Sequence, residues 1–176
     1  MKFGISFTTT FLNQAGALVN IYKDGTILVN HGGTEMGQGL HTKMQQVAAA
    51  EFGVRINKVK VNATNTSKVP NTSATAASAG ADLNGMAVKN TVDILKSRIA
   101  EAVAQIFTEK HPNPPSKKED LVFQDDMILD LMHPERKIAF ADAMPLMQVR
   151  QVSLSAAGYY KTPNIVCRRN SSSFSW

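Results

Sequence analysis

Several features common in proteins are scarce or missing in this chain of 176 residues. Cys167 is its single cysteine, which excludes an internal disulfide and is typical of a reducing compartment. No apolar run approaches the roughly 20 residues that a membrane-spanning helix needs. The first residues also lack the charged start, apolar stretch and cleavage site of a signal peptide. The sequence therefore predicts a cytoplasmic protein without a membrane span.

Motifs for self-contained catalysis are missing as well. No Gly-x-Ser-x-Gly elbow is present, and Lys43 lacks the glycine spacing and the following Ser or Thr of a P-loop. The histidines are dispersed and are interpreted as surface or loop residues rather than metal ligands: His31, His41, His111 and His133. These absences favour a module that holds a ligand over a complete active site.

The charge balance gives little sign of a nucleic-acid partner. The chain has 19 basic and 14 acidic side chains, but the basic residues form no run and aromatic residues make up only 7%. A nucleic-acid footprint needs basic residues clustered on one face, so no such partner is expected. An apolar fraction of 43% and a charged fraction of 19% indicate a globular domain.

The first third of the chain predicts a sheet covered by a helix. Residues 3–10 have strand composition, and residues 15–22 and 26–31 flank an Asp-Gly turn that indicates a hairpin. An amphipathic helix follows from Leu40, and Gly53 is expected to end it. A short strand is predicted at residues 58–62.

The rest of the chain predicts one long helix and smaller elements. The long helix begins at Ala81 or Asp82 and is stopped by the prolines of residues 111–115. Short strands are expected in 121–131, 137–140 and 152–160. A helix over 143–150 is expected to be capped by Asp142, with Pro145 in its first turn. The predicted fold class is α+β, with an antiparallel or mixed sheet packed against two main helices.

Residues 32–39, here called the glycine loop, contain four glycines between a strand and a helix. Free amides at the N-terminus of the following helix are suited to an anion such as phosphate. Glycine-rich turns also occur for purely steric reasons, and the spacing alone favours that alternative slightly. Glu35 has the chemistry of a base, but a structural hydrogen-bonding role is favoured for it.

Residues 62–80 form a second unusual segment, here called the Ser/Thr loop, with hardly a large side chain. Such a composition is typical of a flexible linker. It equally suits a loop wrapped around a polar ligand, because small hydroxyl residues supply many donors in little volume. Both alternatives stay open on composition alone.

Five ordered motifs resemble the molybdenum-binding part of the xanthine dehydrogenase family. They are KFGISF at 2–7, FLNQAGAL at 11–18, HGGTEMGQGLHTK at 31–43, VPNTSATAAS at 69–78 and VSLSAAGYYKTP at 152–163. The resemblance extends over residues 2–166, most closely to a separate molybdenum subunit of bacterial type. It implies a partial molybdopterin-binding domain over 2–166, followed by an unrelated, disordered tail at 167–176.

The resemblance also implies a cofactor, a reaction and partners. The family oxidises hypoxanthine to xanthine and xanthine to urate on molybdenum–molybdopterin, while iron–sulfur clusters and FAD lie elsewhere in the complete enzyme. It assigns cofactor contacts to Gly37, Gln38, Gly39, Thr75, Ala76, Ala77 and Ser78, with the backbone of Ala77 nearest the metal. The implied partners are the remaining molybdenum-subunit segments, an FAD and iron–sulfur subunit or domain, and a purine substrate.

The family's other cofactor loops and its late catalytic glutamate have no counterpart in these 176 residues, so no catalytic residue is assigned. We therefore expect a truncated or frameshifted piece that is inactive alone. Two alternatives remain: a non-catalytic domain that only associates with a partner subunit, and a piece of a related aldehyde oxidase.

Overall fold

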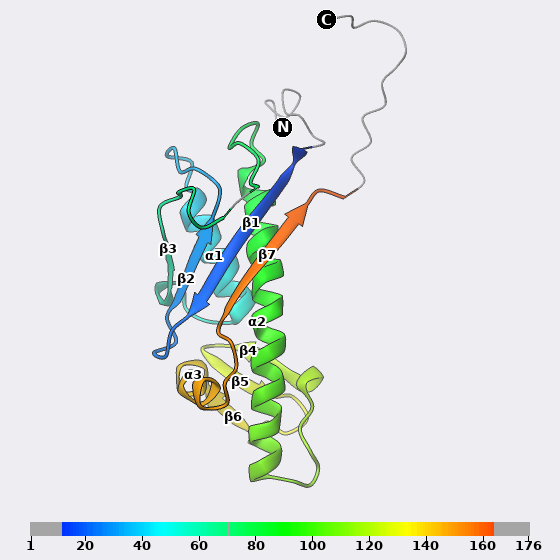
Figure 1. Cartoon of the computed structure of the whole chain (residues 1–176). Helices are drawn as coiled ribbons and strands as arrows, with labels where there is room; N and C mark the ends of the chain where they lie inside the picture. The colour runs from blue at the N-terminus through cyan, green and yellow to red at the C-terminus, as the bar shows by residue number, and fades with distance from the viewer. Residues whose placement is uncertain (1–11, 70, 164–176) are drawn as a thin grey trace, which may run out of the picture.

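The computed structural model describes residues 12–69 and 71–163. The strand predicted at residues 3–10 and the tail at 167–176 lie outside the described residues. The remaining elements form an upper unit around a four-stranded sheet and a lower unit around a three-stranded sheet, joined by one long helix (Figure 1).

The larger sheet is mixed and has the strand order β3-β2-β1-β7. Its strands are β1 (Gln14–Ile21), β2 (Ile27–His31), β3 (Val59–Val61) and β7 (Ser155–Lys161). Only β2 and β3 are parallel. The predicted hairpin joins β1 to β2: the Thr26 amide donates to Asp24 Oδ1 at 3.0 Å, and Gly25 adopts a φ of 77°.

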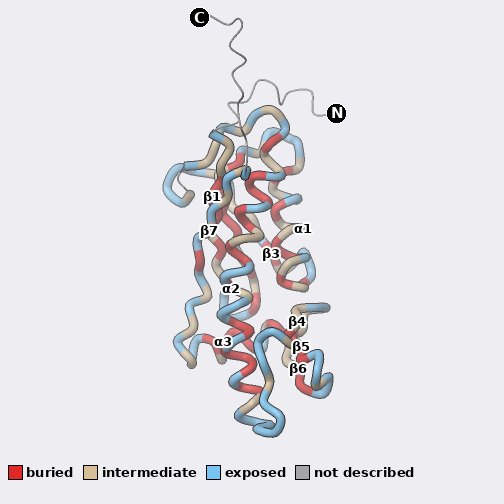
Figure 2. The backbone as a smooth tube through the Cα atoms, turned by 90° about the vertical axis from the view of Figure 1, so that its right-hand side faces the viewer, coloured by how far each residue is buried: buried red, intermediate tan, exposed pale blue. Residues whose placement is uncertain are grey.

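Two helices cover one face of this sheet: α1 (Leu40–Phe52) and α2 (Gly80–Lys110). Every second side chain of β1 is buried beneath them, from Ala15 to Ile21. The core lies between these layers, and the buried stripe of α2 continues down most of its length (Figure 2). The predicted α+β class with two main helices is therefore confirmed.

Two glycines permit close packing. Gly53 ends α1 as predicted, with a left-handed φ of 62° and its N–H donating to the helix carbonyls. Gly158 brings β7 against α2, and a Cβ there would overlap the Thr91 side chain and lie 2.7 Å from its backbone nitrogen.

The lower unit contains β4 (Leu121–Gln124), β5 (Met127–Asp130), β6 (Lys137–Ala139) and α3 (Phe140–Val149). Short 3₁₀ turns lie at Ile56–Lys58 and Lys118–Asp120. The ring of Phe140 joins the two units, because it contacts Phe52 of α1 at a centroid distance of 5.7 Å.

The prediction for α3 was wrong in two respects. The helix begins at Phe140, directly after β6, so Asp142 lies in its first turn and is not its cap. Pro145 consequently lies inside the helix rather than in the first turn. Tertiary packing explains the early start, since buried Phe140 is held by a 2.7 Å bond from its amide to the carbonyl of Asp126.

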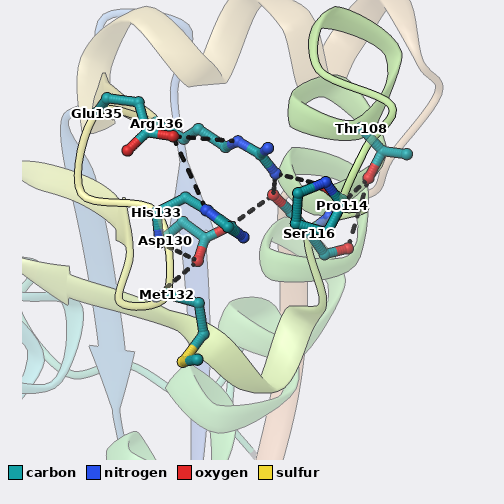
Figure 3. A network of polar contacts seen from close by, with 8 residues as sticks. All are labelled: Thr108, Pro114, Ser116, Asp130, Met132, His133, Glu135 and Arg136. Carbon is teal, nitrogen blue, oxygen red and sulfur yellow. Dashed lines mark hydrogen bonds and ion pairs between the residues drawn. The ribbon is translucent and has the colours of Figure 1, made fainter.

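A buried polar network closes the lower unit (Figure 3). Asp130 is 1% exposed; it accepts the Ser116 hydroxyl at 2.5 Å and the Met132 amide at 2.9 Å. Arg136, also buried, donates to Ser116 Oγ at 2.9 Å and to the carbonyl of Pro114 at 2.8 Å. The network ties the β5–β6 turn to the segment after α2, which is a structural role.

No helix within the described ranges has the length and apolarity needed to span a membrane.

Candidate functional site

A hollow of about 310 Å³ lies where the glycine loop meets the beginning of α2. It brings together five of the seven predicted cofactor residues. Its lining is Met36, Gln38, Leu40, Lys43, Thr75, Ala76, Ala77, Ser78, Gly80 and Ala81. This set contains one cationic side chain and no carboxylate, so its charge suits an anionic ligand.

Hydroxyl groups of the Ser/Thr loop hold the glycine loop in place. The Thr34 amide donates to Thr75 Oγ1 at 2.8 Å. The Thr64 hydroxyl donates to the carbonyl of Gly33 at 2.5 Å. These bonds fix one wall of the hollow against the other.

The same loop also hydrogen-bonds to the start of β1. Ser73 Oγ accepts the amide of Gln14 at 3.0 Å, while the Ser73 amide donates to the Gln14 carbonyl at 2.9 Å. The Thr72 hydroxyl accepts the amide of Gly16 at 3.4 Å. The small polar residues thus anchor the loop to the sheet, which is not the behaviour of a flexible linker.

Glu35 accepts hydrogen bonds from the amides that, on sequence grounds, were suited to bind an external anion. Its Oε1 accepts the amides of Gly37 and Gly39 at 2.9 and 3.0 Å, and its Oε2 accepts the amide of His41 at 3.0 Å. The His41 amide and then those of the two glycines lower the pKa of Glu35 to about 2. The structural role favoured for Glu35 is confirmed, and the anion at the N-terminus of α1 is this carboxylate.

Gln38 lines the hollow and also closes the glycine loop. Its Oε1 accepts the Met36 amide at 2.6 Å, and its Nε2 donates to the Thr34 carbonyl at 2.8 Å. A carboxamide nitrogen carries two hydrogens, so one N–H of Gln38 remains for a ligand.

Gly37 and Gly39 shape the loop but are not among the residues that line the hollow. Their φ angles are 97° and 72°, which side-chain-bearing residues rarely adopt. A Cβ at either position would meet no atom of the described residues within 4 Å, apart from its chain neighbours. Backbone conformation, rather than protein packing, is the reason for glycine here.

The free amides of the site lie in the turn before α2. Ala77 and Ser78 have φ angles of 53° and 61°, two left-handed residues in succession. Within the described ranges, the amides of Ala76, Ala77 and Ser78 donate no hydrogen bond. Successive amides in such a turn form a concave anion-binding surface.

The N-terminus of α2 extends that surface and was missed at the level of sequence. Gly80 and Ala81 line the hollow in the first turn of a 31-residue helix, whose positive dipole end faces it. The available signal was the series of small residues leading directly into the longest amphipathic pattern of the chain.

The interpretation of the histidines as surface or loop residues was wrong for His31, which ends β2. His31 is 2% exposed, and its ring lies 5.1 Å from that of His41 in a T-shaped arrangement. The sequence did not indicate this ring contact, because the two histidines are ten positions apart. They meet only when the glycine loop folds the start of α1 back onto the end of β2. In the described ranges, no group of three or more His, Cys, Asp or Glu side chains is suited to hold a metal.

Comparison with known proteins defines the class. The family model of the molybdopterin cofactor-binding domain matches residues 1–175, and the chain therefore belongs to that family.

The curated relatives are more specific. The chain is 46% identical over 164 residues to "Xanthine dehydrogenase" of Dictyostelium discoideum, 48% to that of Emericella nidulans and 47% to "Xanthine dehydrogenase/oxidase" of Felis catus. Each match covers 93% of this chain but only 10% of the relative. The chain thus spans about a tenth of the length of the relatives it matches.

Solved structures share the fold. Quinoline 2-oxidoreductase from Pseudomonas putida 86 superimposes with a TM-score of 0.76 at 22% identity, over 85% of this chain and 19% of that one. A Cu,Mo-CO dehydrogenase gives 0.73 at 20% identity, over 87% and 19%. At this identity the similarity establishes the fold alone.

Proposed function

We propose that this chain forms one wall of the molybdopterin site in a xanthine dehydrogenase-type molybdenum hydroxylase. In that complete enzyme, hypoxanthine is oxidised to xanthine and xanthine to urate. The names of the curated relatives support this substrate class over an aldehyde. The observation that carries the proposal is the single hollow lined by Gln38 and by all of residues 75–78.

The donor set of the hollow fits molybdopterin. The cofactor presents oxo and phosphate oxygens, which are acceptors, and the hollow presents backbone N–H groups without a carboxylate. Ala76, Ala77 and Ser78 would direct their amides at those oxygens, with Ala77 nearest the metal. Gln38 would contribute its remaining N–H, and Lys43 a positive charge.

When bound, the cofactor supplies oxygen transfer and accepts the electrons of the oxidised purine. The residues of this chain supply binding and orientation. Small side chains at 76–78 allow the backbone to approach closely, and rigid attachment of both loops keeps the donors preorganised. Glu35 is not a base in this proposal, because three amides stabilise its charged form.

The chain by itself is proposed to be inactive. It carries no candidate for the base glutamate that activates the metal's hydroxyl ligand in this family. The other walls of the site, together with the iron–sulfur and FAD centres, would come from the remaining segments and subunits of the enzyme.

Metal and pterin analysis tests the proposal directly. The 176-residue chain is expressed alone and together with the remaining segments of a related molybdenum subunit, and molybdenum and pterin are measured in each purified sample. Cofactor in the reconstituted sample supports the proposal. Absence of cofactor from both samples would favour a domain that only associates with a partner. Urate formation by the chain alone would contradict the proposed inactivity.

A pair of variants tests whether the cofactor binds in the hollow. Ala76→Leu places a bulky side chain in the hollow, while Ala63→Leu makes the same change at an exposed position of the same loop outside it. Only Ala76→Leu is expected to lower the molybdenum content of the reconstituted sample. Equal loss in both variants would place the cofactor elsewhere.

A further inference from the structure

Three polar side chains meet beneath the glycine loop: His31 at the end of β2, His41 in α1 and Asn84 in α2. His31 and Asn84 are each 2% exposed. Nε2 of both histidines and Oδ1 of Asn84 are buried without a hydrogen-bond partner in the described part of the chain. A buried polar atom without a hydrogen-bond partner lowers the stability of the fold, so this cluster requires an explanation.

The hydrogen bonds of the cluster define the state of His31. Its Nδ1 accepts the amide of Gly33 at 3.1 Å. A ring nitrogen that accepts carries no proton, so the neutral ring has its hydrogen on Nε2. Burial, reinforced by nearby His41, lowers the pKa of His31 to about 4, which agrees with the neutral form.

Asn84 connects the glycine loop to the opposite wall of the hollow. Its Nδ2 donates to the carbonyl of Gly80 at 2.8 Å, in the first turn of α2. A Cβ at Gly33 would lie 2.8 Å from the same Nδ2, so the glycine loop rests directly on Asn84.

We propose that His31 is a positioning residue for the hollow: its Nδ1 holds the amide of Gly33, and Gly33 in turn lies against Asn84, whose Nδ2 holds the carbonyl of Gly80. The glycine loop and the first turn of α2 then move as one unit. The assignment of the hollow to molybdopterin rests on the proposed function, whereas the mechanical link does not.

The link is sensitive to protonation. A doubly protonated ring would present Nδ1–H toward the donor N–H of Gly33, so the bond would be lost. The ionisable groups around His31 are His41 from α1, which opposes protonation, and Glu35 from the glycine loop, which favours it; Asn84 of α2 is neutral. The link is therefore expected to be intact near neutral pH and to fail as the pH falls toward 4.

Two substitutions separate the nitrogens of the ring. His31→Asn places Oδ1 where Nδ1 accepts from Gly33, while His31→Gln places its amide near the position of Nε2 and leaves Gly33 without an acceptor. Amide hydrogen exchange in the full chain is the measurement. His31→Gln should accelerate exchange at Gly33 and in the first turn of α2 together, and His31→Asn should keep Gly33 protected. Equal exchange in the two variants would overturn the proposal.

A measurement on the unaltered chain remains informative if a variant fails to fold. The ¹⁵N shifts of the imidazole nitrogens report tautomer and protonation. We expect His31 to show Nε2–H at pH 7 and the Gly33 amide signal to shift with His31 protonation on acidification. A ring with hydrogen on Nδ1 at pH 7 would overturn the proposal. Molybdenum content is measured separately, so coupled exchange in a chain that never takes up cofactor would refute the proposed function and leave the link standing.

Discussion

The backbone amide of Thr34 donates a 2.8 Å hydrogen bond to the hydroxyl of Thr75, which joins two segments 41 residues apart. Each segment alone is a loop with unusual composition. Joined, they form opposite walls of one hollow, which is the proposed binding surface. This contact is therefore the first to test.

Thr75→Val removes the hydroxyl with little change in shape. The Thr34 amide then loses its partner, and because Thr34 is exposed, water replaces part of the bond. We expect the free energy of unfolding to fall by about 0.5–1 kcal/mol. Urea denaturation measures the change. Thr75→Ser keeps the hydroxyl and serves as the control; equal stability of the two variants would show that the bond contributes nothing.

Glu35→Gln tests the internal anion of the glycine loop. The charged carboxylate accepts three amides, and its pKa is lowered from 4.5 to about 2. Its stabilisation is therefore fully present above pH 4.5 and is lost as the pH falls toward 2. Thermal unfolding should show Glu35→Gln less stable than the parent chain at pH 7, with the difference shrinking below pH 4.5.

Exposed Glu101 on α2 provides the control for that experiment. Glu101→Gln should leave the unfolding temperature unchanged at every pH. A Glu35→Gln deficit that is independent of pH would contradict the assigned role.

Ala77→Gly tests the left-handed turn. Alanine at a φ of 53° is strained by about 1–2 kcal/mol, whereas glycine is not. The greater freedom of glycine in the unfolded chain offsets about half of that gain, so a net stabilisation of roughly 0.5–1 kcal/mol is expected. Ala76→Gly lacks a positive φ to relieve and should not stabilise. Denaturation midpoints of the two variants measure the change in stability. Destabilisation by Ala77→Gly would show that the backbone at Ala77 is not strained.

Gly158→Ala tests the approach of β7 to α2. The new methyl group would overlap Thr91 and crowd its backbone, which a flexible side chain alone does not relieve. Overpacking of this kind costs about 1–3 kcal/mol in the free energy of unfolding. Ala157→Ser, at the exposed neighbouring position, should be nearly neutral. A neutral Gly158→Ala would indicate that the strand and helix move apart easily.

Asp130→Asn tests the network of the lower unit. An amide keeps an oxygen acceptor but adds an N–H₂ group among donors, so we expect a loss of about 1–3 kcal/mol. Hydrogen exchange should accelerate first at the amides of Met132 and His133, which Asp130 accepts. Asp125→Asn changes an exposed aspartate and serves as the control. Uniform acceleration across the whole chain would argue against a local role.

Much of the fold was predictable because local chemistry specifies it. The Asp-Gly turn predicted the β1–β2 hairpin, and Gly53 marked the end of α1. The start of α3 was not predictable, because Phe140 begins that helix through a contact with Asp126 of another hairpin. The arrangement of β4 to β6 as a separate sheet likewise depends on pairing across turns.

The residues of the candidate site were predictable from the composition of the chain, but their hydrogen-bond partners were not. Its small residues and the Gln38 and Thr75–Ser78 segments were recognisable from the chain. Nothing local indicated that Glu35 would bind the amides ahead of α1, because a side chain competes with external ligands only when the loop folds back. The contact between His31 and His41 has the same origin.

The sequence by itself determined the glycine loop as a special segment, its small companions at residues 75–78, the α+β class and the family. Tertiary structure decided which amides are free. The amides of Gly37 and Gly39 in the glycine loop donate to Glu35, whereas those of residues 76–78, in the left-handed turn before α2, donate no hydrogen bond within the described residues. The reason is physical: a backbone amide binds a ligand only if no closer acceptor satisfies it, and the nearest acceptor is set by the fold.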